Sequence, residues 1–78
     1  MKSSELLDLS RVRRMALDGT AARLRQAAGL SLKEVAGPVG VTVTSVYRWE
    51  KGLRAPRGEA AIRYLRVLDA LAKVVDAR

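Results

Sequence analysis

Residues 29–56 restrict the possible fold more than any other stretch, because start and stop signals for helices alternate there at short intervals. Ser31 and Glu34 have the spacing of a capping box, in which each side chain bonds the other residue's backbone N–H at a helix start. Gly40 follows soon after and favours a left-handed helix end. The pattern therefore predicts a short helix over 32–39.

A second short helix is predicted immediately afterwards, over 43–51, from the same kinds of signal. Thr42 provides its N-cap, and Gly52 stops it. Val46 and Trp49 lie about one helical turn apart and so share a side, which their hydrophobicity and size assign to the core. The stretch as a whole predicts two short helices joined by a tight glycine turn.

The rest of the chain also follows helical periodicity, without the alternating pattern that forms strands. Further helices are expected over residues 4–17, 21–28 and 59–75. We therefore predict an all-α fold, a compact bundle of about five helices that forms a single domain over residues 1–78. Its parts are an N-terminal helical extension over 1–19, a core with the two short helices over 20–57, and a long C-terminal helix over 58–78.

The composition disfavours several classes of function. The chain has no Cys and no His, and therefore no disulfide, no thiolate metal site and no histidine general base. Its 8 carboxylates are scattered and it has no glycine-rich phosphate loop, so we expect no enzyme, no metal and no cofactor. No apolar run is long enough to cross a membrane, and no signal-peptide pattern is present. These features predict a cytoplasmic protein. The bias toward Ala, Arg and Val, with no Phe or Cys, suggests a GC-rich bacterial or phage genome, so we expect the protein at the nucleoid of a bacterium or a phage-infected host.

A net charge of +7 and an isoelectric point of about 10.9 indicate a polyanionic partner. The predicted helix 43–51 has four residues on the side opposite Val46 and Trp49. These residues are Val43, Thr44, Tyr47 and Arg48. We assign them to base contacts in the major groove of double-stranded DNA, because arginine bonds guanine bidentately and methyl groups pack against thymine. The alternative is an ordinary solvated face, which an exposed valine beside an exposed tyrosine disfavours.

Contacts to the DNA backbone are expected at helix starts, whose free N–H groups favour anions, and in the basic loop after the second short helix. The residues assigned to phosphates are Ser31, Lys33, Thr42, Ser45, Lys51, Arg54 and Arg57. For each cation taken singly, simple solvation remains an alternative. The group is favoured because little acidic charge stands near it in the sequence.

Several motifs occur in a consistent order along the chain. They are Leu24-Arg25-Gln26-Ala27-Ala28-Gly29-Leu30-Ser31, Val35-Ala36, Gly40-Val41-Thr42, Val46-Tyr47-Arg48-Trp49-Glu50-Lys51-Gly52 and Pro56. Together they resemble the helix-turn-helix family of phage Cro and lambda-type repressors, the XRE family, over roughly residues 20–70. In that family the second matched helix crosses the DNA backbone and the third is the recognition helix. The resemblance also implies an ion pair between Arg25 and Glu50 that orients the recognition helix.

Some positions depart from the pattern of this family. Leu32 stands where many relatives carry a polar residue that bonds a phosphate. Gly37 and Pro38 weaken the middle of the first short helix, and the ring of Pro38 is expected to kink or tighten its last turn. The helix before Thr20 is additional, and the long C-terminal helix replaces two shorter ones.

The resemblance implies a small transcriptional regulator that binds a palindromic operator as a homodimer, with half-sites about one helical turn apart. Two apolar stripes are candidates for the dimer interface, one from Leu6 to Met15 and the other from Tyr64 to Val75. The alternative is a protein-interaction role on the same fold. The chain would then be an antitoxin, or a phage recombination-directionality or architectural factor that works through bent DNA.

Overall fold

The computed structural model describes residues 2–77, and this range contains five α-helices and no strand. The helices are α1 Ser3–Leu17, α2 Thr20–Ala27, α3 Leu32–Val39, α4 Val43–Glu50 and α5 Gly58–Asp76. The all-α bundle of five helices expected from the sequence is confirmed, and no helix end differs from its predicted place by more than one residue. The predicted limits of the domain, residues 1 and 78, lie outside the described residues.

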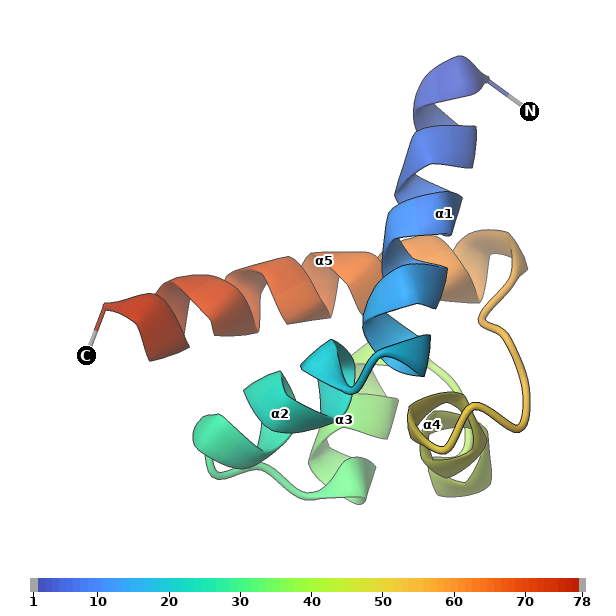
Figure 1. Ribbon diagram of the computed structural model, residues 1–78. Coiled ribbons are helices and arrows are strands. Elements are labelled where there is room, and N and C mark those ends of the chain that lie inside the picture. The colour runs from blue at the N-terminus through green and yellow to red at the C-terminus, as the bar shows by residue number, and fades with distance from the viewer. Residues whose placement is uncertain (1, 78) are drawn as a thin grey trace.

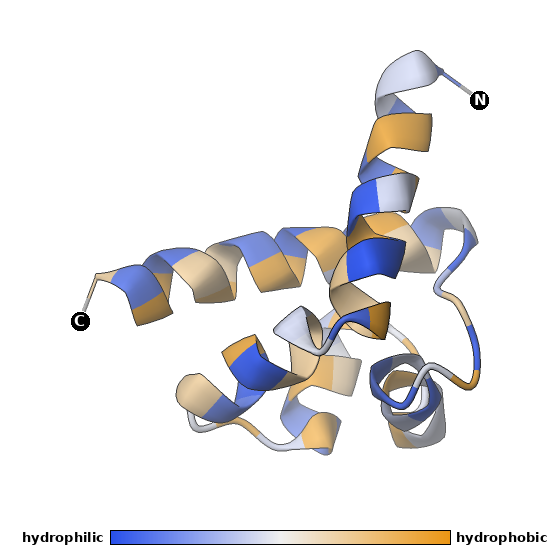
Figure 2. Ribbon diagram, viewed as in Figure 1, coloured by the Kyte–Doolittle hydropathy of each residue, from blue (hydrophilic) through white to orange (hydrophobic). Residues whose placement is uncertain are grey.

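The long helix α5 is the element on which the others are arranged (Figure 1). Helices α2, α3 and α4 lie together on one side of it. Helix α1 crosses α5, and the N-terminal half of α1 extends away from the rest of the molecule. Hydrophobic and hydrophilic bands alternate along α1 and α5 in Figure 2, as expected for helices that bury one face.

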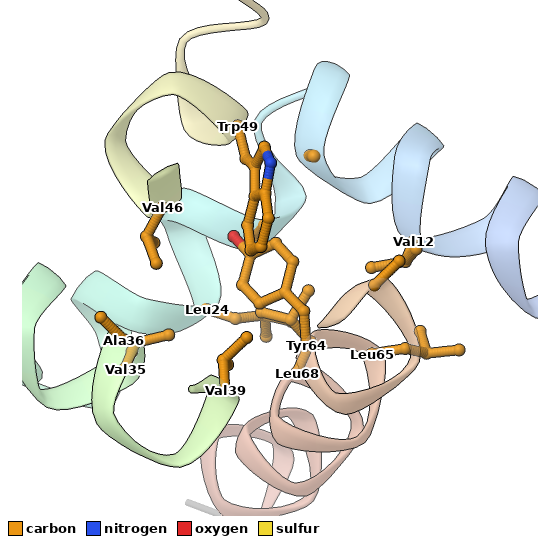
Figure 3. Packing of buried hydrophobic residues seen from close by; sticks show 13 residues of the cluster. Val12, Leu24, Val35, Ala36, Val39, Val46, Trp49, Tyr64, Leu65 and Leu68 are labelled. Carbon is orange, nitrogen blue, oxygen red and sulfur yellow. The ribbon is translucent and has the colours of Figure 1, made fainter. Parts of the chain in front are cut away.

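The core takes hydrophobic side chains from all five helices. Its members are Val12, Ala16, Ala21, Leu24, Val35, Ala36, Val39, Val46, Trp49, Ala61, Tyr64, Leu65 and Leu68. At its centre the ring of Trp49 in α4 packs on the ring of Tyr64 in α5, with a centroid distance of 4.8 Å (Figure 3). This contact fastens the inner face of α4 to α5.

Because some residues of the two predicted apolar stripes are buried, fewer of them could contact a second copy of the chain. Val12 is fully buried and Tyr64 is 1% exposed, so neither residue is available to a partner. Both side chains belong to the chain's own core because α1 and α5 pack against each other. The stripes as predicted are therefore too long, and the large apolar side chains exposed on these two helices include Leu6, Leu7 and Val74.

Glycine ends α2, α3 and α4 in the same way. At the end of α3, the N–H of Gly40 donates to the Gly37 carbonyl and the N–H of Val41 to the Ala36 carbonyl, at 3.0 and 3.2 Å. Gly40 has a φ of 76°, a left-handed value that favours glycine. Helix α3 continues through Pro38, and equivalent bonds close α2 and α4, neither of which contains proline. The tight last turn expected for α3 is therefore present, and because α2 and α4 close in the same way without proline, its glycine end is enough to explain it.

Candidate nucleic-acid interface

Helix α4 has one face in the core and the opposite face in solvent. Val46 is fully buried and Trp49 is 5% exposed. The solvent face carries Val43, Thr44, Tyr47 and Arg48, all of them exposed. Val43 and Tyr47 retain exposed fractions of 41% and 45%. The structure thus brings the four residues assigned to base contacts together on one side of a helix.

Thr42 caps the start of α4, and its Oγ1 accepts the N–H of Ser45 at 3.1 Å. The hydroxyl oxygens of these two residues lie 3.0 Å apart, so one donates to the other and one O–H hydrogen remains for an outside acceptor. The first turn of α4 contains no acidic residue. The positive end of the helix dipole is therefore not neutralised locally, which favours an anion such as phosphate.

The start of α3 differs because a carboxylate already occupies it. Ser31 and Glu34 form the predicted capping box, with both hydrogen bonds at 3.0 Å. The backbone N–H of Ser31 lowers the pKa of Glu34, so this carboxylate is charged at neutral pH. The negative charge of Glu34 offsets the positive charge of Lys33, its neighbour in the chain. The start of α3 therefore attracts a phosphate less than the start of α4 does.

A bidentate ion pair joins α2 to the C-terminal end of α4. Nε and Nη2 of Arg25 donate to Oε2 and Oε1 of Glu50, at 2.7 and 3.0 Å. Nη1 of Arg25 donates to the Leu30 carbonyl at 2.9 Å. The two charged side chains are only 14% and 7% exposed. A nearly buried pair of this geometry fixes the orientation of α4 relative to α2.

The Tyr64 hydroxyl is a polar group left without a hydrogen bond. It is buried, and no partner for it is found among the described residues. Burial raises the pKa of this hydroxyl, the charge of Glu50 raises it further, and the charge of Arg25 opposes the rise. The tyrosine therefore stays neutral over the physiological range, and its ring serves as a hydrophobic support for Trp49.

The loop between α4 and α5 carries three exposed cations, Lys51, Arg54 and Arg57. Nζ of Lys51 lies 5.8 Å from the centre of the Tyr47 ring, a cation–π distance. Helix α1 also reaches this loop, because Nε of Arg13 donates to the Pro56 carbonyl at 2.8 Å. The sequence does not point to this contact of Arg13, since the two residues are 43 positions apart and leave no local signal.

A family model described as a helix-turn-helix domain matches residues 19–77, which is most of the chain. The chain belongs to the helix-turn-helix domain family. Membership of the family indicates DNA binding, and α3 and α4 are the two helices on either side of the turn. Helix α1 precedes the matched residues. No curated protein and no solved structure matches the chain closely enough to count as similar.

The described residues form neither a metal site nor a membrane-spanning helix. Across residues 2–77, no three His, Cys, Asp or Glu side chains gather in a way that could hold a metal ion. None of the described helices is both long enough and apolar enough to span a membrane. The exposed face of α4, with the cations around it, is the candidate site that the geometry supports best.

Proposed function

We propose that this helix-turn-helix protein is a sequence-specific transcriptional regulator of the Cro and lambda-repressor (XRE) type, which places α4 in the major groove of double-stranded DNA. The observation that carries the proposal is the division of α4 into a buried face with Val46 and Trp49 and an exposed face of four residues. An α-helix fits the width of the major groove. The capped start at Thr42 and the ion pair of Glu50 support the proposal, because they fix the helix at both ends.

Each side chain of the exposed face has a role in the contact with DNA. Arg48 donates two hydrogen bonds to O6 and N7 of a guanine, and Thr44 bonds a base edge. The methyl groups of Val43 and Thr44 pack against the methyl group of a thymine. Tyr47, with Lys51 close to its ring, contacts the sugar or phosphate at the edge of the groove.

The DNA backbone supplies the part of the affinity that does not depend on sequence. A net charge of +7 favours this attraction. The residues that we assign to phosphates are Thr42 and Ser45 at the start of α4, Lys51, Arg54 and Arg57 after its end, and Ser31 and Lys33 at the start of α3. The capping carboxylate at the start of α3 makes the last two the weaker contacts.

The regulator is further proposed to bind a palindrome as a homodimer. Leu6 and Leu7 are 54% and 72% exposed, on the half of α1 that extends from the body of the molecule (Figure 1). Exposed leucines on a projecting helix favour a contact with another protein. In an antitoxin this surface would bind a toxin instead. The regulator is preferred because α4 keeps a recognition face exposed as well.

Replacing Arg48 by alanine is expected to weaken binding to a selected DNA site by roughly 1–3 kcal/mol and to relax the preference at one base pair. The measurement is a competition assay against sites with single base changes. Arg66→Ala is the control, because it removes the same charge from a residue that lies on α5 and not on α4. Arg66 lines a hollow between α1 and α5. An Arg48→Ala variant with unchanged base preference would refute the role assigned to this arginine.

A further inference from the structure

We propose that Arg13 of α1 and Arg54 of the loop between α4 and α5 bind one phosphate of the DNA backbone beside the recognition helix. The inference rests on the proposed DNA binding and adds α1 to the surface that touches DNA. Helix α1 lies outside residues 19–77, the part that matches the helix-turn-helix family. The contact is therefore supplied by the helix that precedes the family domain.

A hollow of about 110 Å³ lies where α1, the end of α4 and the loop after α4 meet. Both arginines line it, together with Leu17, Trp49, Gly52 and Pro56. No carboxylate is found among the described residues around it. Its charged groups all have the same sign, so the hollow attracts a negatively charged ligand.

The hydrogen bond of Arg13 fixes its guanidinium but leaves most of its donors free. Nε donates to the Pro56 carbonyl, whereas Nη1 and Nη2 have no partner in the described chain. Arg11, on the same helix, differs because its two Nη atoms bind Asp69 at 2.9 and 2.8 Å. A planar guanidinium with free Nη groups matches the oxygens of a phosphate. Arg13 is thus a cation with a fixed orientation and free N–H donors, and Arg54 supplies a second positive charge from the loop.

The hollow lies at the C-terminal end of the proposed recognition helix, on the core side of α4, and the loop that carries Arg54 forms part of its wall. Trp49, in the last turn of α4, lines it, and Gly52 leads the chain from α4 into the loop. A helix in the major groove has a sugar–phosphate backbone along each of its sides. The anion nearest to the hollow in such a complex is a phosphate in the wall of the groove.

The test combines Arg13→Ala with the removal of charge from single phosphates. DNA that contains the selected site is made with a neutral methylphosphonate at one position at a time, and dissociation constants are measured for both proteins. We expect one position, beside the major groove, where the neutral linkage weakens binding of the wild type several-fold but leaves the variant unchanged. The slope of log affinity against log salt should also fall by about 1 in the variant.

Two further variants separate a phosphate contact from a purely structural role. Arg14→Ala removes the same charge from a neighbouring residue that does not line the hollow, and it should respond to the neutral phosphate as the wild type does. Arg13→Gln keeps an N–H donor for the Pro56 carbonyl without the charge, and it should behave as Arg13→Ala does. Restored binding by Arg13→Gln, or equal effects of every neutral linkage on wild type and Arg13→Ala, would overturn the proposal. A wild-type protein that binds no DNA would reject the proposed function instead.

Discussion

Replacing Glu50 by alanine is expected to lower the free energy of unfolding by about 3–5 kcal/mol, because it leaves the charge of Arg25 nearly buried and unpaired. The Arg25 side chain is only 14% exposed, so water replaces little of the lost interaction. Helix α4 also loses its link to α2, and DNA binding should weaken. Urea unfolding followed by the fluorescence of the single Trp measures the stability directly.

Two other variants isolate the reason for this loss. Glu59→Ala breaks a contact of 3.8 Å to Arg63 in which the glutamate side chain is 97% exposed, and it should leave the unfolding curve unchanged. Replacing Arg25 and Glu50 together by leucine should recover most of the stability but not the DNA affinity, because the orienting contact stays absent. A Glu50→Ala protein as stable as Glu59→Ala would contradict a structural role for the ion pair.

Shortening Tyr64 to alanine is expected to cost about 3–5 kcal/mol of stability, because it removes the ring that supports Trp49 in the core. Tyr64→Phe keeps this ring and removes a buried hydroxyl that has no hydrogen-bond partner among residues 2–77. The phenylalanine variant should therefore be as stable as the wild type or more stable. A large loss in Tyr64→Phe would show instead that the hydroxyl has a bonding partner.

The stability of the wild type and that of Tyr64→Phe should depend differently on pH. Burial raises the pKa of Tyr64 above its ordinary value of 10.0, so the folded state holds this proton more tightly than the unfolded state. The contribution of this proton to stability is fully present below pH 10.0, the ordinary pKa of tyrosine. It is lost as the pH rises above this value, by up to about 1.4 kcal/mol per pH unit. The wild type should therefore lose stability at alkaline pH more steeply than Tyr64→Phe. Parallel curves for the two proteins would contradict this account.

Local chemistry explains why the helix ends could be predicted from the sequence. The capping box of Ser31 and Glu34 and the left-handed end at Gly40 each depend on residues close together in the chain. The inward direction of Val46 and Trp49 follows from their spacing in the same way. The spacing of residues in α4 therefore predicts its exposed face without reference to any tertiary contact.

Long-range contacts could not be predicted in this way. Nothing local links Arg13 to Pro56, and the pairing of Arg25 with Glu50 came from the resemblance to a family. The sequence predicts Tyr64 on a partner surface because it does not distinguish between adjacent apolar stripes of one helix. Only the packing of α5 against its neighbours decides which stripe is buried.

Selection of bound sites from random double-stranded DNA tests most directly the claim that α4 recognises base pairs. We expect enrichment of a palindrome with half-sites about one helical turn apart. The same selection with Arg48→Ala should lose its preference at one base pair in each half-site. Bound DNA without any enriched sequence would contradict the claim, and a single unrepeated half-site would contradict the dimer.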